Sequence, residues 1–189
     1  MGSLCKLPHP RLISREGAAL VVIDVQEKLL PKIADGERTV ANIIKLIRFS
    51  RICGMPIILT EQYPKGLGKT VKEIKDEIPD IVTMEKTSFS CFGAQGFKDA
   101  LVKLKISTLI LTGIEAHVCV AQTALEALDD YEVCVISDAV SSRALGNVQV
   151  GLQRMRDCGA MISSTEMVMY EIMRDARTEE FRKSRILLK

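Results

Sequence analysis

The chain has 189 residues, of which 47% are hydrophobic, and its 26 basic residues nearly balance its 24 acidic ones. This length suffices for one well-buried core and is short for two, so we expect a single domain. A net charge of +2, with the basic residues scattered, argues against an electrostatic surface for nucleic acid or membranes. The longest apolar runs are far too short to span a bilayer, and no secretory signal precedes them, so we expect a cytoplasmic protein.

Six cysteines are spread along the chain without any C-x-x-C pair, and the chain has only two histidines. Metal sites need closely spaced ligands, so we expect no bound metal, and nothing in the sequence calls for another cofactor. Without a secretory signal, disulfide bonds are not expected either.

The first sixteen residues carry two prolines and no periodic pattern, which predicts an arm at residues 1–16 and one domain at residues 17–189. Short apolar runs then alternate with segments of helical periodicity. Strands are predicted at residues 18–24, 56–60, 81–84, 108–112, 132–136 and 160–163. Helices are predicted at residues 36–53, 71–77, 97–104, 148–158 and 165–174, and another begins near residue 118. Residues 61–69 and 88–96 are predicted as loops.

This alternation predicts an α/β fold. We expect a single-domain three-layer sandwich, in which a six-stranded, mainly parallel sheet has helices on both faces. Crossovers between parallel strands are almost always right-handed. In such sheets ligands collect at the carboxyl edge, where the strands end.

Three reactive residues follow three of the predicted strands: Asp24, Lys86 and Cys119. A carboxylate can take a thiol proton, and an ammonium group can stabilise the resulting thiolate. Cys119 is expected in the first turn of a helix, where unpaired N–H groups and the helix dipole favour a thiolate. Each residue also has a simpler explanation, as a capping aspartate, a solvated lysine or a core cysteine. Their convergence at one edge of the sheet favours the catalytic interpretation.

Five segments carry a resemblance to a known family. They are VVIDVQ at 21–26, TEQYPKGLG at 60–68, EKTSFSCF at 85–92, GIEAHVCVAQTALEA at 113–127 and TEMVMYEI at 165–172. In this order they resemble the isochorismatase-like cysteine hydrolases, and most of all their metal-independent branch, the isochorismatase-domain-containing proteins. The resemblance covers about residues 14–175 and implies an isochorismatase-like sheet with Rossmann-type strand order.

The resemblance implies a role for each residue of a catalytic triad. Asp24 matches the general base, Lys86 the charge-stabilising lysine and Cys119 the nucleophile. Cys119 would attack a carbonyl carbon and form a thioester, which water activated by Asp24 would hydrolyse. Cys91, on a loop near Lys86, is the competing candidate for the reactive thiol.

The resemblance also implies a cis peptide bond between Ile114 and Glu115. Its role in the family is to aim backbone N–H groups, here those of Glu115 or Ala116 together with that of Cys119, at a developing oxyanion.

The nicotinamidase branch of the family binds a metal through an aspartate and histidines after the second strand. This chain has Glu61, Gln62 and Tyr63 there. The departure predicts a hydrolase without a catalytic metal and argues against nicotinamidase activity.

Loops at the same edge of the sheet supply candidates for the substrate pocket. These are Gln26, Leu29, Gln62, Tyr63, Phe89, Phe92, Ile114 and His117. The apolar members could equally belong to the core or to a subunit interface, and His117 could face the pocket or pack beside it. Together they predict a small, mostly apolar cavity.

The sequence therefore predicts a cysteine-dependent hydrolase of a small amide or carbamoyl compound. Two alternatives stay open: a vinyl-ether hydrolase of the isochorismatase type, and a non-catalytic interaction protein that retains the fold. We expect a small-molecule substrate and no nucleic-acid or membrane partner. The helix predicted at 165–174 has apolar residues on more than one face, which predicts a homo-oligomer of two or more subunits. Those residues are Met167, Val168, Met169, Ile172 and Met173.

Overall fold

The structure is a computed structural model that describes residues 12–188. Most of the predicted arm at residues 1–16 lies outside the described residues. Its last part, residues 12–16, lies against the C-terminal helices. There the backbone N–H of Ile13 donates to Glu171, and Arg15 forms an ion pair with Glu180.

Six parallel strands form one sheet in the order β3-β2-β1-β4-β5-β6. The strands are β1 Ala18–Ile23, β2 Ile57–Gln62, β3 Thr83–Lys86, β4 Thr108–Ile114, β5 Glu132–Ser141 and β6 Met161–Ser163. The α-helices are α1 Gly36–Cys53, α2 Pro64–Leu67, α3 Lys72–Lys75, α4 Phe97–Lys103, α5 Ala121–Ala127, α6 Leu145–Asp157, α7 Thr165–Met173 and α8 Glu179–Ser184. This order is the Rossmann-type order, so the predicted fold class is confirmed.

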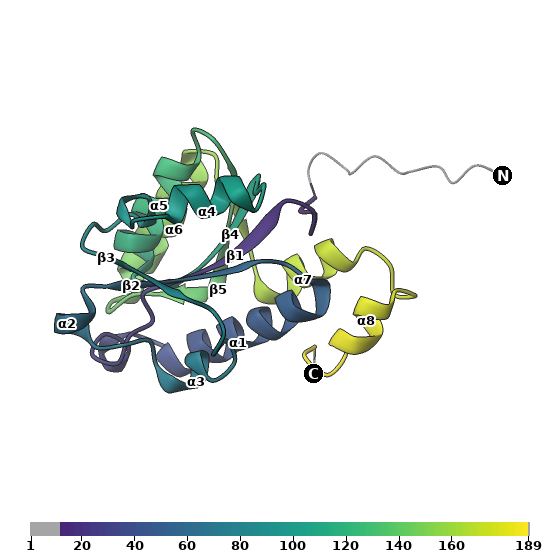
Figure 1. The fold of residues 1–189 in the computed structure, drawn as a ribbon, viewed down its shortest axis with the longest axis horizontal. Helices are drawn as coiled ribbons and strands as arrows, with labels where there is room; N and C mark the ends of the chain where they lie inside the picture. The colour runs from purple at the N-terminus through teal and green to yellow at the C-terminus, as the bar shows by residue number, and fades with distance from the viewer. Residues whose placement is uncertain (1–11, 189) are drawn as a thin grey trace.

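Helices cover both faces of the sheet (Figure 1). Helices α1, α3, α7 and α8 lie on one face, and α4, α5 and α6 lie on the other. All six residues of β1 are buried, and they alternate between the two cores. Leu20 and Val22 pack on the α1 side, whereas Val21 and Ile23 pack on the α5 side. The continuous apolar run of this strand thus reflects burial on both faces.

Strand β4 runs to Ile114, beyond the predicted end at residue 112, because Gly113 lies inside the strand. Gly113 pairs with Ile23 of β1 and has a φ angle of 112°. A Cβ atom at this position would lie 2.1 Å from the carbonyl oxygen of Ile23. The glycine is therefore what allows β1 and β4 to approach each other.

Other boundaries differ from prediction for local reasons. The predicted loop at 61–69 contains the end of β2 and the single turn of α2, which Pro64 begins because proline fits the first helical turn. Strand β5 continues to Ser141, well past residue 136. Helix α8 was not predicted, because its six residues lack a clear apolar period. Its signal is Thr178, whose hydroxyl accepts the N–H of Phe181 as an N-cap.

The apolar faces of α7 have an explanation within the chain. Val168, Met169, Ile172 and Met173 are all buried in the core on the α1 side. Only Met167 of the predicted set is exposed, with 54% of its surface accessible. The chain's own core therefore covers most of the apolar residues of α7, and these residues do not indicate a subunit interface.

We predict that Gly113→Ala lowers the free energy of unfolding by about 3 kcal/mol or more, because the added methyl group meets the β1 backbone at a φ angle that alanine avoids. Gly146→Ala in α6 is the matched control, since nothing lies within 4 Å of its added Cβ atom. It should leave stability unchanged or raise it by up to about 1 kcal/mol. Urea denaturation measures both, and equal effects would contradict the close contact.

Candidate functional site

The candidate site lies where β1, β2, β3 and β4 end. The sheet order changes direction between β1 and β4, and ligands bind at such points in α/β sheets. Asp24 follows β1 directly and has a left-handed backbone with φ 54°. Lys86 is the last residue of β3, two strands away from β1. The fold thus brings two residues far apart in sequence to one edge.

Asp24 and Lys86 form a buried ion pair. The Lys86 ammonium lies 2.5 Å from Asp24 Oδ2, and both side chains have 0% of their surface exposed. The hydroxyl of Thr60 donates to the other carboxylate oxygen, Oδ1, at 2.8 Å. Burial raises the pKa of Asp24 above its usual value, and the charge of Lys86 opposes that rise. Two opposing effects thus act on the pKa of Asp24: burial raises it, and the nearby cation lowers it.

Cys119 lies against this pair. It belongs to the π-helical segment Ala116–Val120, which precedes α5, so the helix predicted near residue 118 begins with a wide turn. The thiol interacts with the carboxylate of Asp24 both as a hydrogen-bonding partner and through charge. Only 6% of the residue is exposed.

The surroundings of the Cys119 thiol raise its pKa, which favours the protonated form. Burial is the largest cause of its raised pKa and the negative charge of Asp24 the next, whereas Lys86 acts in the opposite direction. The helical position of Cys119 predicted that the thiolate is favoured, whereas its pKa is raised, and burial is the largest cause. Such a thiol needs a base to become a nucleophile, and the adjacent carboxylate is suited to that task.

Cys91 is a second thiol near the same carboxylate. It is fully buried, its sulfur lies 3.8 Å from the hydroxyl of Thr60, and burial raises its pKa to about 11. The hydroxyl of Thr123 accepts the backbone N–H of Cys91 at 2.9 Å and donates to the carbonyl of Cys119 at 2.7 Å. This threonine ties the loop that carries one thiol to the turn that carries the other.

The turn before Cys119 contains the cis peptide bond between Ile114 and Glu115 that the resemblance implies. Ile114 and Ala116 are fully buried. The Glu115 carboxylate accepts the backbone N–H of Arg143 at 2.9 Å and its guanidinium at 3.1 Å. The turn is therefore anchored to the segment that follows β5.

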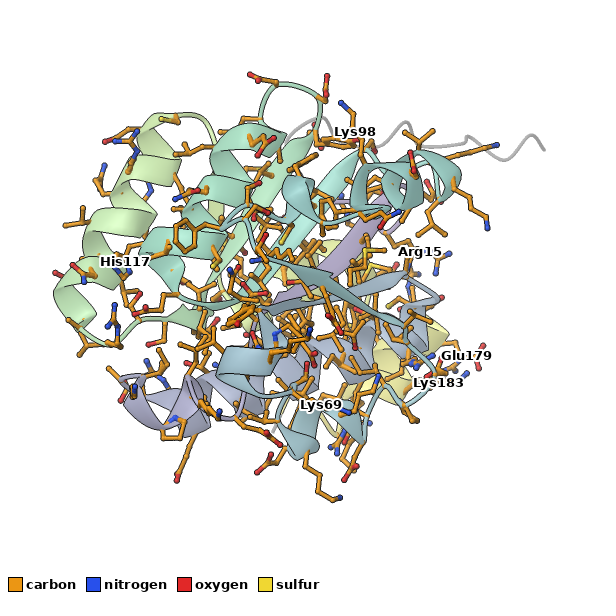
Figure 2. All side chains as sticks on the ribbon, turned by 60° about the vertical axis from the view of Figure 1, so that its left-hand side comes forward. Arg15, Lys69, Lys98, His117, Glu179 and Lys183 are labelled. Atoms are coloured by element: carbon orange, nitrogen blue, oxygen red, sulfur yellow. The ribbon has the colours of Figure 1, made fainter. Side chains whose placement is uncertain are left out.

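His117 packs beside the site. Its Nδ1 lies 3.0 Å from the hydroxyl of Ser142, and its Nε2 lies 3.3 Å from the amide nitrogen of Asn147. Figure 2 shows this histidine next to α6 at the rim of the molecule. Of the two alternatives that the sequence left open, these contacts favour packing.

The other pocket candidates separate into two groups. Leu29 and Phe92 are partly buried against the two cores, and the Phe92 ring meets Phe97 edge to face at 5.2 Å. Tyr63 and Phe89 are about half exposed, at 53% and 52%. Their backbones contact Lys86, because the N–H of Tyr63 donates to the Lys86 carbonyl and the Phe89 carbonyl accepts from the Lys86 ammonium.

Gln26 and Gln62 make their hydrogen bonds within the chain. The amide of Gln26, which is fully buried, pairs with the backbone of Gln62 and with the carbonyl of Gly68. The amide of Gln62 contacts Lys86 and the carbonyl of Thr87. Both side chains hold the loops around the ion pair in place.

Sequence reasoning did not single out Thr60, Thr123 or Arg143. Thr60 stands two residues before Gln62 on β2, so strand alternation puts both on the face that carries Lys86. This alternation along β2 could have been recognised in the sequence. Thr123 and Arg143 act through contacts between elements that lie far apart in sequence, and no local pattern marks them.

Among residues 12–188, no group of three or more histidine, cysteine, aspartate or glutamate side chains is arranged to hold a metal ion. Within the same residues, no helix is both long and apolar enough to cross a membrane.

Residues 18–167 of the chain match the isochorismatase domain. The chain belongs to the isochorismatase family. Isochorismatase domain-containing protein 2 of Danio rerio is 38% identical over 178 residues, which cover 93% of this chain and 89% of the relative. The secreted isochorismatase effector Isc1 of Phytophthora sojae is 35% identical over 183 residues, covering 91% and 84%.

Solved structures agree with this assignment. The MAR1 ribonuclease of Caenorhabditis elegans superposes with a TM-score of 0.89 at 34% identity, covering 94% of this chain and 92% of that chain. YcaC from Pseudomonas aeruginosa, solved with covalent acrylamide, has a TM-score of 0.86 at 26% identity, covering 93% and 91%. The YcaC gene product of Escherichia coli, described as an octameric hydrolase of unknown specificity, shares the fold with a TM-score of 0.85 at 24% identity, covering 94% and 95%.

We predict that Lys86→Met lowers the free energy of unfolding by about 3–5 kcal/mol near pH 7, because it leaves the Asp24 carboxylate buried without its cation. Asp24 would then bind a proton in the folded state. A carboxyl group whose folded pKa is raised reduces stability only above its unfolded pKa of about 4, so the loss should shrink as the pH falls toward that value.

Urea denaturation between about pH 4 and pH 8 measures this dependence. The double variant Asp24→Asn/Lys86→Met is the control, and its stability should lack the pH dependence that Asp24 causes in Lys86→Met, because no buried carboxyl remains at this position. A Lys86→Met loss that is constant over this range would contradict the coupling.

Proposed function

We propose that the protein is a cysteine hydrolase that cleaves the C–N bond of a small amide or carbamoyl compound, with Cys119 as nucleophile, Asp24 as general base and acid, and Lys86 as the fixed cation. The observation that carries the proposal is the Cys119 thiol beside the carboxylate of the buried Asp24–Lys86 pair. The chain's membership of the isochorismatase family supports hydrolysis as the reaction class.

The reaction follows from this arrangement. Asp24 takes the thiol proton as the Cys119 sulfur attacks the carbonyl carbon, and the carbonyl oxygen becomes an oxyanion. The C–N bond then breaks while Asp24 returns the proton to the leaving nitrogen, which departs as ammonia or an amine. Water then attacks the thioester carbon while Asp24 removes a proton from it. The C–S bond breaks, Asp24 returns this proton to the Cys119 sulfur, and the acid is released with the thiol and the carboxylate regenerated. Lys86 stabilises Asp24 in the steps in which its carboxylate is ionised.

Backbone N–H groups are the proposed donors to the oxyanion. The turn at Ile114–Glu115 and Ala116 comes just before Cys119 in the chain, and this supports its N–H groups as donors together with that of Cys119. The buried Glu115 carboxylate, held by Arg143, keeps this turn in place.

The rings of Tyr63 and Phe89 are the proposed walls for the apolar part of the substrate. They are half exposed and belong to residues whose backbones contact Lys86, whereas Phe92 and Leu29 pack against the cores. A compact substrate with an apolar group beside its amide carbon suits such walls.

We predict that Cys119→Ala lowers turnover of an amide or carbamoyl substrate by at least about 10³-fold, whereas Cys91→Ala keeps most of it, because only the first removes the nucleophile. A panel of small amides, ureas and carbamates identifies the substrate first. A second readout is whether acrylamide forms a covalent adduct on Cys119, which mass spectrometry detects. This reagent is chosen because the relative YcaC from Pseudomonas aeruginosa was solved with covalent acrylamide. Full turnover by Cys119→Ala would overturn the proposal.

Two other activities are separated by the same variants. Hydrolysis of an isochorismate-type vinyl ether does not need a thiol nucleophile, so it would survive Cys119→Ala.

RNA cleavage is worth assaying because the Caenorhabditis elegans relative is named a ribonuclease. The net charge of +2 gives no strong attraction for RNA, and a buried thiol beside a carboxylate suits carbonyl chemistry better. A protein with none of these activities and a tight protein partner would be an interaction module.

A cytoplasmic homo-oligomer completes the proposal. Five described cysteines are free, which suits a reducing compartment, although one relative is a secreted effector. The octameric Escherichia coli relative has the same fold. Sedimentation velocity tests self-association directly.

A further inference from the structure

The Lys86 ammonium is surrounded by oxygen atoms. Four lie within 3.2 Å: Asp24 Oδ2 at 2.5 Å, Gln62 Oε1 at 2.8 Å, the carbonyl of Phe89 at 3.0 Å and that of Ser88 at 3.2 Å. An ammonium group has only three N–H donors, and this side chain has 0% of its surface exposed. Lys86 is thus fully occupied by protein oxygens, and its position is set by them.

Gln62 supplies the one neutral side-chain oxygen among these four. The orientation of its amide is fixed, because Nε2 donates to the carbonyl of Thr87 at 2.7 Å. With the nitrogen engaged there, Oε1 is the atom that faces Lys86. The side chain therefore joins the ammonium to the segment that follows β3.

Gln26 holds Gln62 in turn. Its Oε1 accepts the backbone N–H of Gln62 at 2.8 Å, and its Nε2 donates to the carbonyls of Gln62 at 3.0 Å and Gly68 at 2.7 Å. The buried side-chain amide thus pairs with the end of β2 much as a neighbouring strand would. Gln26 stands two residues after Asp24, so the segment that carries the proposed base also carries this brace.

We propose that Gln62 and Gln26 are positioning residues, which hold the Lys86 ammonium on the Asp24 carboxylate and thereby set the basicity of Asp24 without contacting substrate. The inference rests on the proposed function for its catalytic consequence, but the positioning itself is a property of the folded chain. It gives two of the pocket candidates a different role from substrate binding.

The groups that face Asp24 determine the expected effect. Lys86 of β3 is the cation, the thiols of Cys119 and Cys91 approach from the two adjoining turns, and Thr60 of β2 donates a hydrogen bond. Gln62→Glu would put a second carboxylate on Lys86. The ammonium would then stabilise the ionised form of Asp24 less, and Asp24 would keep its proton to a higher pH.

The test is a pH titration of the Asp24 carboxyl carbon by ¹³C NMR in the full chain, with the signal assigned by its loss in Asp24→Asn. Gln62→Glu should move the midpoint upward by roughly one pH unit. Gln62→Met, which removes the acceptor without adding charge, should move it upward by less. Gln149→Glu, on an exposed position of α6, adds the same charge elsewhere and should leave the midpoint in place.

An unchanged midpoint in folded Gln62→Glu, or in Gln62→Met if the first variant does not fold, overturns the inference. With a substrate in hand, the acidic limb of the pH profile of kcat/KM should shift with the midpoint while KM stays constant. A raised KM with an unchanged midpoint would instead make Gln62 a substrate ligand. Because the titration needs no substrate, an inactive protein or an active Cys119→Ala variant would refute the proposed function and leave this inference standing.

Discussion

The structure of the site depends on one interaction, the ion pair between the fully buried side chains of Asp24 and Lys86. A carboxylate or an ammonium alone at this depth would cost several kcal/mol, and each is present because the other is. The surrounding hydrogen bonds from Thr60 and to Gln62 satisfy the remaining atoms of the pair. Everything proposed for the chemistry follows from how this pair meets the sulfur of Cys119.

The pair also explains why the thiol is protonated at rest. Its pKa is raised by burial and by the Asp24 carboxylate, so the sulfur does not react indiscriminately. The same carboxylate is placed to take the proton when a carbonyl group arrives. In the proposed mechanism, this carboxylate activates the Cys119 thiol when substrate is bound. Cys91 is less exposed than Cys119, at 0% against 6%.

Much of this was readable in the sequence. Buried parallel strands appear in the sequence as continuous apolar runs, so β1, β4 and the alternation of strands with helices were predicted. Asp24, Lys86 and Cys119 could be named as candidates because reactive side chains stand after strands. Their contact could be expected from the rule that parallel strands share a carboxyl edge.

What the sequence could not supply were quantities that depend on packing. The balance between the helix dipole and desolvation at Cys119 is set by burial, which no local pattern encodes. The roles of Gln26 and Gln62 depend on contacts across 36 positions of the chain, so their amides looked equally suited to a ligand. The apolar faces of α7 looked unpartnered until the C-terminal segment and α1 were seen to cover them.

The most direct test of the central claim is the pH dependence of Cys119 alkylation by iodoacetamide, followed by mass spectrometry in the wild-type protein and in Asp24→Asn. The account predicts that the variant reacts at lower pH than the wild type, because the thiol loses the carboxylate that raises its pKa and keeps Lys86 as its charged neighbour. Identical pH profiles in the two proteins would mean that the sulfur does not meet the ion pair, and would contradict the account.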